Sequence, residues 1–494
     1  MDLQFAEDPA GPVEKPVTLH RHFGLLQAIA LNVTMIVGAG VFATIPSILK
    51  KLPGPYAVLA WLAAGILILL DGLVWSELAT MFPGSGGSYR YLLEGYGRER
   101  WGRMMAFLFI WQFLLSGPLE IASGLIVIAQ FATYLSPTFD ELNNAWTCSI
   151  ILWEKENLKM ILSPARLLVQ GLGIFLIFLL YRRISSLGKM TVTFWIGVLA
   201  VIAWILIDGG FRFQPAVAFD WPENGSVAEG PVDFLQRLGQ AMILAMYAYL
   251  GYYNVCYIGD EVRNPGRTLP RAILGSALLV IILFVGLHLA MLGTINWKEA
   301  VAGDDDYSLP AEFMKAIHQD WATKLVMVLL IWTVLGSAFA GLLGYSRIPY
   351  GAARYGHFFG IFRHVHPVHH IPHFSLVLVG ALTLFWCFFD LEKVINALIT
   401  TRILEQFVAQ IGAVVLLRRS HPNLSRPYRL WLYPVPCGLA LVGWLFMYVC
   451  AEPLYIVLGL STLVAGILAF LIWSKRIRQW PFATADNNKP SPSS

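Results

Sequence analysis

The stretch that decides the fold is Met35-Ile36-Val37-Gly38-Ala39-Gly40-Val41-Phe42, an apolar segment interrupted by two glycines. A second apolar segment, Met246-Tyr247-Ala248-Tyr249-Leu250-Gly251-Tyr252, is interrupted by a glycine about 210 residues later. A helix that opens in the middle of a bilayer must place its freed backbone N–H and C=O groups against protein or a polar cavity, because lipid offers them no partner. Two interrupted spans at corresponding positions predict a transporter with its ligand site at the breaks.

The composition indicates a membrane protein. Hydrophobic residues make up 57% of the 494 residues and charged residues 13%, whereas an average soluble domain carries roughly 25% charged residues. Apolar windows long enough to cross a bilayer predict an all-α polytopic protein of the cell membrane with about twelve spans. The predicted spans are 23–50, 55–81, 101–136, 165–183, 188–208, 233–258, 270–293, 321–347, 373–390, 393–417, 429–450 and 453–474.

Lys and Arg concentrate in alternate loops, which predicts the orientation. Basic residues resist translocation, so the loops that hold them stay in the cytoplasm and both termini are expected there. The loops 137–164, 209–232 and 294–320 hold fewer basic residues and are expected outside. This sidedness accounts for the net charge of +4, which we do not read as a sign of nucleic-acid binding. The cytoplasmic loops are expected to hold Arg90, Arg98, Arg100, Arg103, Arg182, Arg183, Lys189, Arg263, Arg267, Arg271, Arg347, Arg354, Arg363, Arg418, Arg419, Arg426 and Arg429.

The five cysteines do not suggest a disulfide framework. Four of them lie in or beside apolar spans, where cysteine behaves as a small hydrophobic residue. Cys148 alone falls in a predicted outer loop. We favour a free thiol there and expect no partner subunit bound through Cys148.

Four stretches carry a family resemblance when they are taken in order. They are Ile36-Val37-Gly38-Ala39-Gly40-Val41-Phe42 with Pro46; Glu77-Leu78 leading into Phe82-Pro83-Gly84-Ser85-Gly86-Gly87-Ser88-Tyr89; Glu261-Val262-Arg263-Asn264-Pro265 with Arg267 and Pro270-Arg271; and Arg347-Ile348-Pro349-Tyr350 with Ala353-Arg354. In this combination the chain resembles the amino-acid permeases of the amino acid–polyamine–organocation (APC) superfamily. That resemblance covers roughly residues 20–475 and implies a LeuT-like fold, a five-plus-five inverted repeat in which the first and sixth helices are broken.

The resemblance also implies a division of the chain. The ranges are a cytoplasmic N-terminal tail over 1–22, a first repeat over 23–208, an extracellular loop over 209–232, a second repeat over 233–418, two further spans over 419–475 and a disordered cytoplasmic tail over 476–494.

The same resemblance implies a substrate site built from backbone atoms. The substrate carboxylate would bind the N–H groups of Gly38, Ala39 and Gly40. The ammonium group would face carbonyls around Tyr247, Ala248 and Tyr249, beside Gly251, together with those of Ile36 and Val37. Tyr247 occupies the position of an aromatic outer gate. The alternatives are close helix packing for the glycines and an ordinary packed aromatic ring for Tyr247.

Charged residues inside apolar spans are further candidates, because burying a charge in a bilayer is costly. Glu120 lies in the third span, and Arg402 and Glu405 lie three residues apart in the tenth, which places them on one face of a regular helix. They would contact the substrate side chain, or Arg402 would pair with Glu405 or Glu120 as a buried strut. Tyr252, Tyr253 and Ser337 complete the candidates for the side-chain pocket.

Other ionisable residues are weaker candidates. Asp71 and Glu77 lie in the second span, and His288 in the seventh is expected to be a hydrogen-bonded packing residue. The histidines between His364 and His373 lack convincing metal-ligand spacing, so we predict no metal site. No cofactor motif and no arrangement of nucleophile and base appear in the spans, so an enzyme is not expected.

Ion coupling is where the chain departs from part of the family. Several proton-linked members carry a lysine inside the fifth span, where this chain has Gly197 or Val198. Sodium would need hydroxyl groups on the eighth span, and Ser337 with Thr333 provides few of them. Exchange or facilitated uptake of amino acids is therefore preferred. The alternatives are a proton-coupled symporter of an amino acid or polyamine, using Glu120 or Glu405, and a nutrient sensor that binds its ligand without moving it.

Overall fold

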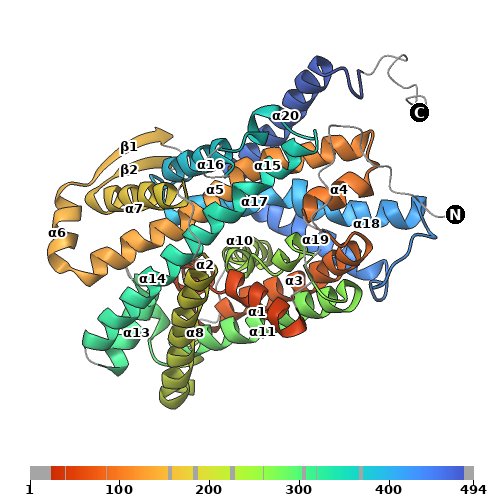
Figure 1. Cartoon of the computed structure of the whole chain (residues 1–494). Coiled ribbons are helices and arrows are strands. Elements are labelled where there is room, and N and C mark those ends of the chain that lie inside the picture. The colour runs from red at the N-terminus through yellow and green to blue at the C-terminus, as the bar shows by residue number, and fades with distance from the viewer. Residues whose placement is uncertain are drawn as a thin grey trace, which may run out of the picture.

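The computed structural model describes residues 24–38, 40–84, 86–153, 158–181, 187–222, 229–259, 261–302, 308–318, 320–366 and 371–482. Apart from one short hairpin, these residues form a bundle of helices (Figure 1). Seven stretches of them are long and apolar enough to cross a membrane by length and composition. The prediction of an all-α polytopic membrane protein is confirmed, while the number twelve and the inverted repeat stay predictions.

Both predicted breaks separate helices. The first span divides into α1 (Leu25–Ile36) and α2 (Gly40–Lys51), and the sixth divides into α10 (Pro231–Tyr249) and the short 3-10 helix η3 (Asn254–Tyr257). The tenth span continues from α17 (Leu391–Arg402) through a π-helical turn, η5 (Ile403–Val408), into α18 (Ala409–Ser420). The remaining long helices are α3 (Ala57–Met81), α5 (Trp101–Leu135), α7 (Pro164–Tyr181), α8 (Leu187–Arg212), α11 (Pro265–Leu292), α14 (Asp320–Tyr345), α16 (His373–Trp386), α19 (Val435–Cys450) and α20 (Pro453–Arg476).

Short elements mark the two ends of the bundle. At the left of Figure 1 lie α6 (Pro137–Ala145), α13 (Leu309–Ile317) and the antiparallel strands β1 (Cys148–Trp153) and β2 (Leu158–Leu162), which we call the hairpin end. At the right lie α4 (Ser88–Gly95) and α18, which with the loop 421–434 we call the α4 end. Four other short helices are η1 (Gly54–Tyr56), α9 (Pro215–Ala218), α12 (Trp297–Ala302) and α15 (Arg347–Arg354), with a 3-10 turn η4 (Gly360–Arg363) after the last.

The hairpin differs from the plain outer loop that the sequence suggested for 137–164. Ser136 caps α6 by accepting the Phe139 N–H at 3.3 Å, and Pro137 fills the first helical position, where a missing N–H costs nothing. The hairpin is tied to the bundle by Ile161 N, which donates to the carbonyl of Phe388 at 2.7 Å.

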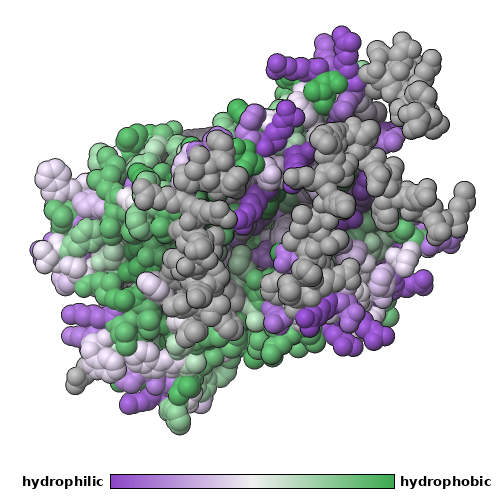
Figure 2. Space-filling model, viewed as in Figure 1, coloured by the Kyte–Doolittle hydropathy of each residue, from purple (hydrophilic) through white to green (hydrophobic). Residues whose placement is uncertain are grey.

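Hydrophobic residues cover the flank of the molecule that α7 and α14 form, as Figure 2 shows. Ile174, Phe175 and Phe178 are all exposed on α7. A contiguous apolar surface of this kind belongs against lipid rather than water.

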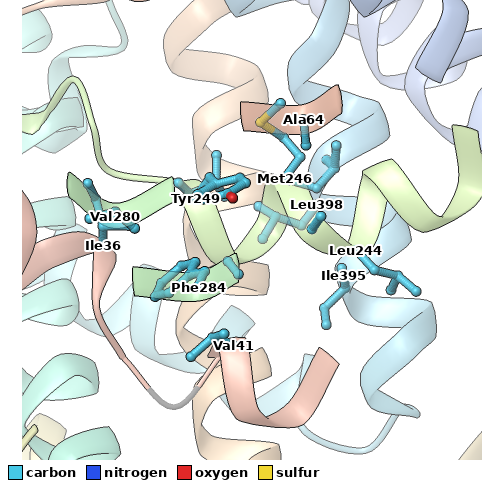
Figure 3. Close-up of a cluster of buried hydrophobic side chains, with 14 of the residues drawn as sticks. Ile36, Val41, Ala64, Leu244, Met246, Tyr249, Val280, Phe284, Ile395 and Leu398 are labelled. Atoms are coloured by element: carbon cyan, nitrogen blue, oxygen red, sulfur yellow. The ribbon is translucent and has the colours of Figure 1, made fainter. Parts of the chain in front are cut away.

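The buried core surrounds the two breaks. Figure 3 shows Ile36 and Val41, from the two sides of the first break, near Phe284 of α11 and Tyr249 of α10. Helix α3 packs against α11 and α10, and α5 packs against α14 and α17. The breaks are therefore enclosed by protein, as their freed backbone groups require.

Candidate functional site

The first break is short and leaves the backbone accessible. Helix α1 ends at Ile36, Val37 is extended with φ −79° and ψ 97°, and α2 begins at Gly40. A Cβ atom added to Gly38 would meet no atom within 4 Å, so open space borders the backbone there. Ala39 lies outside the described residues. The N-terminus of α2, which carries a partial positive charge, begins two residues after this open space.

The second break lies directly beside the first. Gly251 has φ +105°, a conformation that strains any residue with a side chain. A Cβ atom there would lie 3.3 Å from the carbonyl carbon of Met35 and 3.4 Å from the side chain of Ile36. The close approach of the two breaks therefore depends on a glycine at this position.

Asn32 holds the second break in place, and the sequence reasoning overlooked it. Its side-chain amide donates to the carbonyl oxygen of Tyr252 at 2.7 Å and to Ser276 Oγ at 3.1 Å. Its Oδ1 accepts the N–H of Val255 at 2.8 Å. Asn32 is fully buried, so it replaces the helical hydrogen bonds that the break removes. The available signal was a single asparagine in the apolar run of the first span.

Tyr247, the predicted gate, links the two halves of the site. A Cβ atom added to Gly40 would lie 2.9 Å from its ring. The hydroxyl group of Ser123 on α5 donates to the Tyr247 hydroxyl oxygen at 2.9 Å. The half-buried ring of Tyr247 thus lies across the start of α2.

The other three tyrosines around the break point in different directions. Tyr249 donates to the carbonyl of Trp61 at 3.2 Å and stacks on Phe284. Tyr253 stacks on Trp75 with ring centroids 4.4 Å apart. The hydroxyl of Tyr252 is hydrogen-bonded to Asp71 on α3.

Arg402 pairs with Glu120, one of the two alternatives that the sequence left open. The Arg402 Nη2 atom lies 2.6 Å from Glu120 Oε2, and its Nε donates to Ser116 Oγ at 3.0 Å. Its Nη1 lies 3.4 Å from the hydroxyl of Tyr253. Arg402 is 1% exposed, so this neutral pair joins α17, α5 and the second break inside the bundle.

The expectation that Arg402 and Glu405 share one helical face is wrong. Glu405 lies in the π-helical turn η5, whose wider turn changes the angular spacing of residues three apart. No hydrogen bond or ion pair joins the two side chains in the described part of the chain. Glu405 is 4% exposed, and its Oε1 makes no hydrogen bond within the described residues.

Several lesser candidates lie outside this group. Ser337 is exposed on α14, and the hydroxyl of Thr333 donates to the carbonyl of Leu329 at 2.8 Å, so neither is aimed at the breaks. His288 is buried and accepts the indole N–H of Trp61 at 3.2 Å, as expected for a packing residue. The side chain of Val198 lies outside the described residues. No cluster of three metal-ligating side chains occurs within the described ranges.

A cavity of about 560 Å³ lies between the first break and the hairpin end. It begins at Phe42 and Ala43, just after Gly40, and extends to β2 and the start of α17. Two ion pairs cross its wall, Lys51 with Glu392 at 3.1 Å and Lys393 with Glu452 at 3.3 Å. Its charged lining residues are Lys50, Lys51, Lys159, Arg166, Lys393, Asp390, Glu392 and Glu452.

The α4 end is closed by a network around Glu77, which the sequence ranked as a weak candidate. The buried carboxylate of Glu77 accepts Arg418 Nε at 2.8 Å and Nη2 at 2.5 Å. It also accepts the backbone N–H of Leu430 at 2.9 Å, and Arg426 Nε lies 3.5 Å away. These bonds tie α3 to the end of α18 and to the loop that follows.

Known protein sequences resemble this chain along most of its length. Residues 23–476 match the family model described as "Amino acid permease". The human cystine/glutamate transporter is 26% identical over 475 residues, which are 94% of this chain and 88% of that protein. The serine/threonine exchanger SteT of Bacillus subtilis is 27% identical over 432 residues, covering 87% of this chain and 90% of SteT.

A third relative is named for proton-coupled transport. The aspartate-proton symporter of Bacillus subtilis is 26% identical over 442 residues, which cover 87% of this chain and 78% of that protein. All three relatives are named for transport, which supports the expectation that this chain is a transporter and not an enzyme. With the family model matched along almost its whole length, the chain belongs to the amino acid permease family.

Proposed function

We propose that the chain exchanges amino acids across the membrane by alternating access, with the substrate bound between the two breaks. The observation that carries this proposal is the juxtaposition of the breaks, in which Gly251 approaches Met35 and Ile36 while Gly40 approaches Tyr247. Two helices opened at the same depth offer both kinds of free backbone group to one small ligand.

The signs of the half-helix dipoles match the two charges of an amino acid. The N-terminus of α2, at Gly38, Ala39 and Gly40, would bind the carboxylate, because its unpaired N–H groups carry partial positive charge. The C-termini of α1 and α10 would face the ammonium group with carbonyls near Ile36 and Tyr247. Ala248 and Val37 would contribute backbone only.

The two ends of the bundle support a conformation that is open on one side. The charged cavity reaches from Phe42 toward the hairpin end, and the Glu77 network joins the helices at the α4 end. With the basic loops and both termini in the cytoplasm, the cavity would open to the outside and Tyr247 would form the outer gate. Transport would then require the Glu77 network to separate while the cavity closes.

The chemistry of the side-chain pocket favours a structural role for the Arg402 and Glu120 pair. A guanidinium group already paired at 2.6 Å carries no free charge for a substrate. Tyr247, whose ring lies across the start of α2, supplies aromatic surface beside the break, which suits a side chain of moderate size.

The test is flux in proteoliposomes that contain the purified chain. We expect uptake of a labelled amino acid to be faster into vesicles preloaded with unlabelled amino acid than into empty ones. Gly38→Val should abolish this flux, because its side chain would enter the open space beside the break. Gly438→Val is the matched control, since a Cβ atom at exposed Gly438 on α19 also meets nothing within 4 Å.

Normal exchange by the Gly38→Val variant would contradict the proposed carboxylate site. Stabilisation of the protein by an amino acid without any flux would instead indicate a sensor. Equal uptake into empty and preloaded vesicles would favour facilitated uptake over exchange.

Proton-coupled symport is the second candidate, favoured by the buried carboxylate of Glu405, whose Oε1 has no partner among the described residues. A relative is named an aspartate-proton symporter. An imposed proton gradient that drives accumulation into empty vesicles in the wild type, but not in Glu405→Gln, would support this candidate over exchange.

A further inference from the structure

We infer that Asp71 is a proton-binding site that controls the second break, so that the rate of transport depends on whether its carboxyl group is ionised. The transport measurements that test this inference rest on the proposed function, whereas the proton site itself does not. Asp71 lies near the middle of α3 and is fully buried.

Asp71 joins three parts of the bundle through its two carboxyl oxygens. Oδ2 is hydrogen-bonded to the hydroxyl of Tyr252, which lies in the second break. Oδ1 accepts the indole N–H of Trp444 on α19 at 3.2 Å. A single carboxyl group on α3 therefore fixes a residue of the second break against α19.

The surroundings of Asp71 hold no compensating charge. No Lys, Arg or His forms an ion pair with it among the described residues. From the second break it faces the tyrosines 252 and 253, and from α19 it faces Trp444 and, further off, the thiol of Cys437. On the α11 side, a Cβ atom added to Gly72, the next residue of α3, would lie 3.3 Å from the apolar side chains of Ile273 and Leu274. A buried carboxylate without an opposite charge nearby is costly in free energy. Binding a proton neutralises the carboxylate and removes this cost.

The donor set at Asp71 fits a proton and does not fit sodium. Sodium needs several oxygen ligands, as hard cations do. The indole of Trp444 is a donor only, and it occupies one carboxyl oxygen. The nearby carbonyl oxygen of Tyr252 is already bonded to Asn32 at 2.7 Å. A proton requires no further ligand.

Protonation would change the hydrogen bond to Tyr252 and leave the one to Trp444. Because the indole N–H can only donate, Oδ1 must stay an acceptor. A proton added to Oδ2 makes that oxygen a donor, so the Tyr252 hydroxyl must become an acceptor or turn away. Tyr252 follows Gly251, whose φ of +105° lies in the region that favours glycine. The change is thus passed to the residue beside the point where the two breaks meet.

The first experiment measures exchange in proteoliposomes between about pH 5 and pH 8, with equal pH on both sides. For the wild type we expect the rate to change by at least about threefold over this range, because one group changes its charge. Asp71→Asn keeps an acceptor for Trp444 and cannot ionise, so its rate should vary by less than about 1.5-fold. Asp233→Asn is the control, because Asp233 pairs with Arg237 on the exposed start of α10, and this variant should keep the wild-type profile.

Tyr252→Phe tests the link to the break. This variant keeps the ring and the ionisable carboxyl group but removes the hydroxyl that joins them, so we expect a flat pH profile in a folded protein. A wild-type profile in either Asp71→Asn or Tyr252→Phe would overturn the inference, as would a wild-type rate that does not vary with pH.

Infrared difference spectroscopy gives a readout that does not depend on transport. Acidification should produce the carbonyl band of a protonated carboxylic acid in the wild type and in Asp233→Asn, and this band should be missing in Asp71→Asn. Its presence in a protein that moves no amino acid would contradict the proposed function and leave the proton site standing. Its persistence in Asp71→Asn would overturn the proton site, whatever the flux.

Discussion

The ring of Tyr247 occupies the space in which a side chain at position 40 would lie, since a Cβ atom on Gly40 would be 2.9 Å from Tyr247 Cε1. The start of α2 and the last turn of α10 are thus in direct contact through one ring and one glycine. The position of this ring therefore determines how much room lies beside the backbone at Gly40.

Gly40→Ala should impair transport without unfolding the protein. The added methyl group must displace the ring of Tyr247, and overpacking of this kind costs about 1–3 kcal/mol. We expect the exchange rate to fall by about tenfold or more. Gly438→Ala, on the exposed face of α19, is the matched control and should leave the rate unchanged. A normal rate in Gly40→Ala would show that the ring does not need its present position.

Asn32→Ala should weaken both stability and transport. The change leaves the carbonyl of Tyr252 and the N–H of Val255 buried without their partner, at about 1–3 kcal/mol each. We expect a lower unfolding temperature and loss of exchange. Asn143→Ala is the control, since the side chain of Asn143 accepts the N–H of Ala165 at 3.0 Å at the hairpin end. Equal effects of the two variants on exchange would contradict a special role for Asn32.

Arg402→Met should destabilise the protein strongly, because it leaves Glu120 without its counter-charge. Breaking a buried ion pair from one side typically costs about 3–5 kcal/mol. The double variant Arg402→Met/Glu120→Gln should recover part of this loss, which thermal unfolding of the four proteins of the cycle would measure. Purely additive effects would mean that the pair is not coupled. Unchanged stability together with a raised KM would indicate that Arg402 contacts the substrate instead of forming a structural ion pair.

Glu77→Gln should loosen the α4 end. The amide keeps much of the shape but loses the charge that holds Arg418, so the buried thiol of Cys437 on α19 should react faster with a thiol reagent. Cys387, which lies beside Ala122, should be unaffected. Glu94→Gln is the control, because it breaks an exposed pair with Arg98 on the same end. An unchanged rate at Cys437 would show that other contacts keep this end closed.

The breaks were predictable because glycine leaves a direct mark in an apolar run. Gly38, Gly40 and Gly251 lie where helices α1, α2 and α10 begin or end. The residue that holds the second break in place was harder to find. One asparagine in a long apolar segment reads like any packed polar residue, and only the fold brings Asn32 to Val255, across 223 positions of sequence.

The charged residues were easy to notice in the sequence, but their partners were not predictable from it. Glu120 and Arg402 stood out because ions are rare in apolar spans, but the choice of partner depended on helix geometry. A regular α-helix would place Arg402 and Glu405 on one face, and the π-helical turn at Ile403–Val408 does not. The ranking of Asp71 and Glu77 as weak candidates had a similar cause, because their partners lie in the second break, α18 and α19, far away in the sequence.

The same π-helical turn determines the direction in which the side chains of the last part of the tenth span point. Removing one residue from 403–408 would restore a continuous α-helix and rotate everything after it by about 100°. Gln410 would then leave Ser88, from which its amide is now 3.1 Å, and Arg418 would leave Glu77. A single inserted or deleted residue at this turn is therefore not a neutral change in loop length. Among related sequences, a one-residue gap here would separate proteins that close the α4 end through this carboxylate from proteins that must close it by other means.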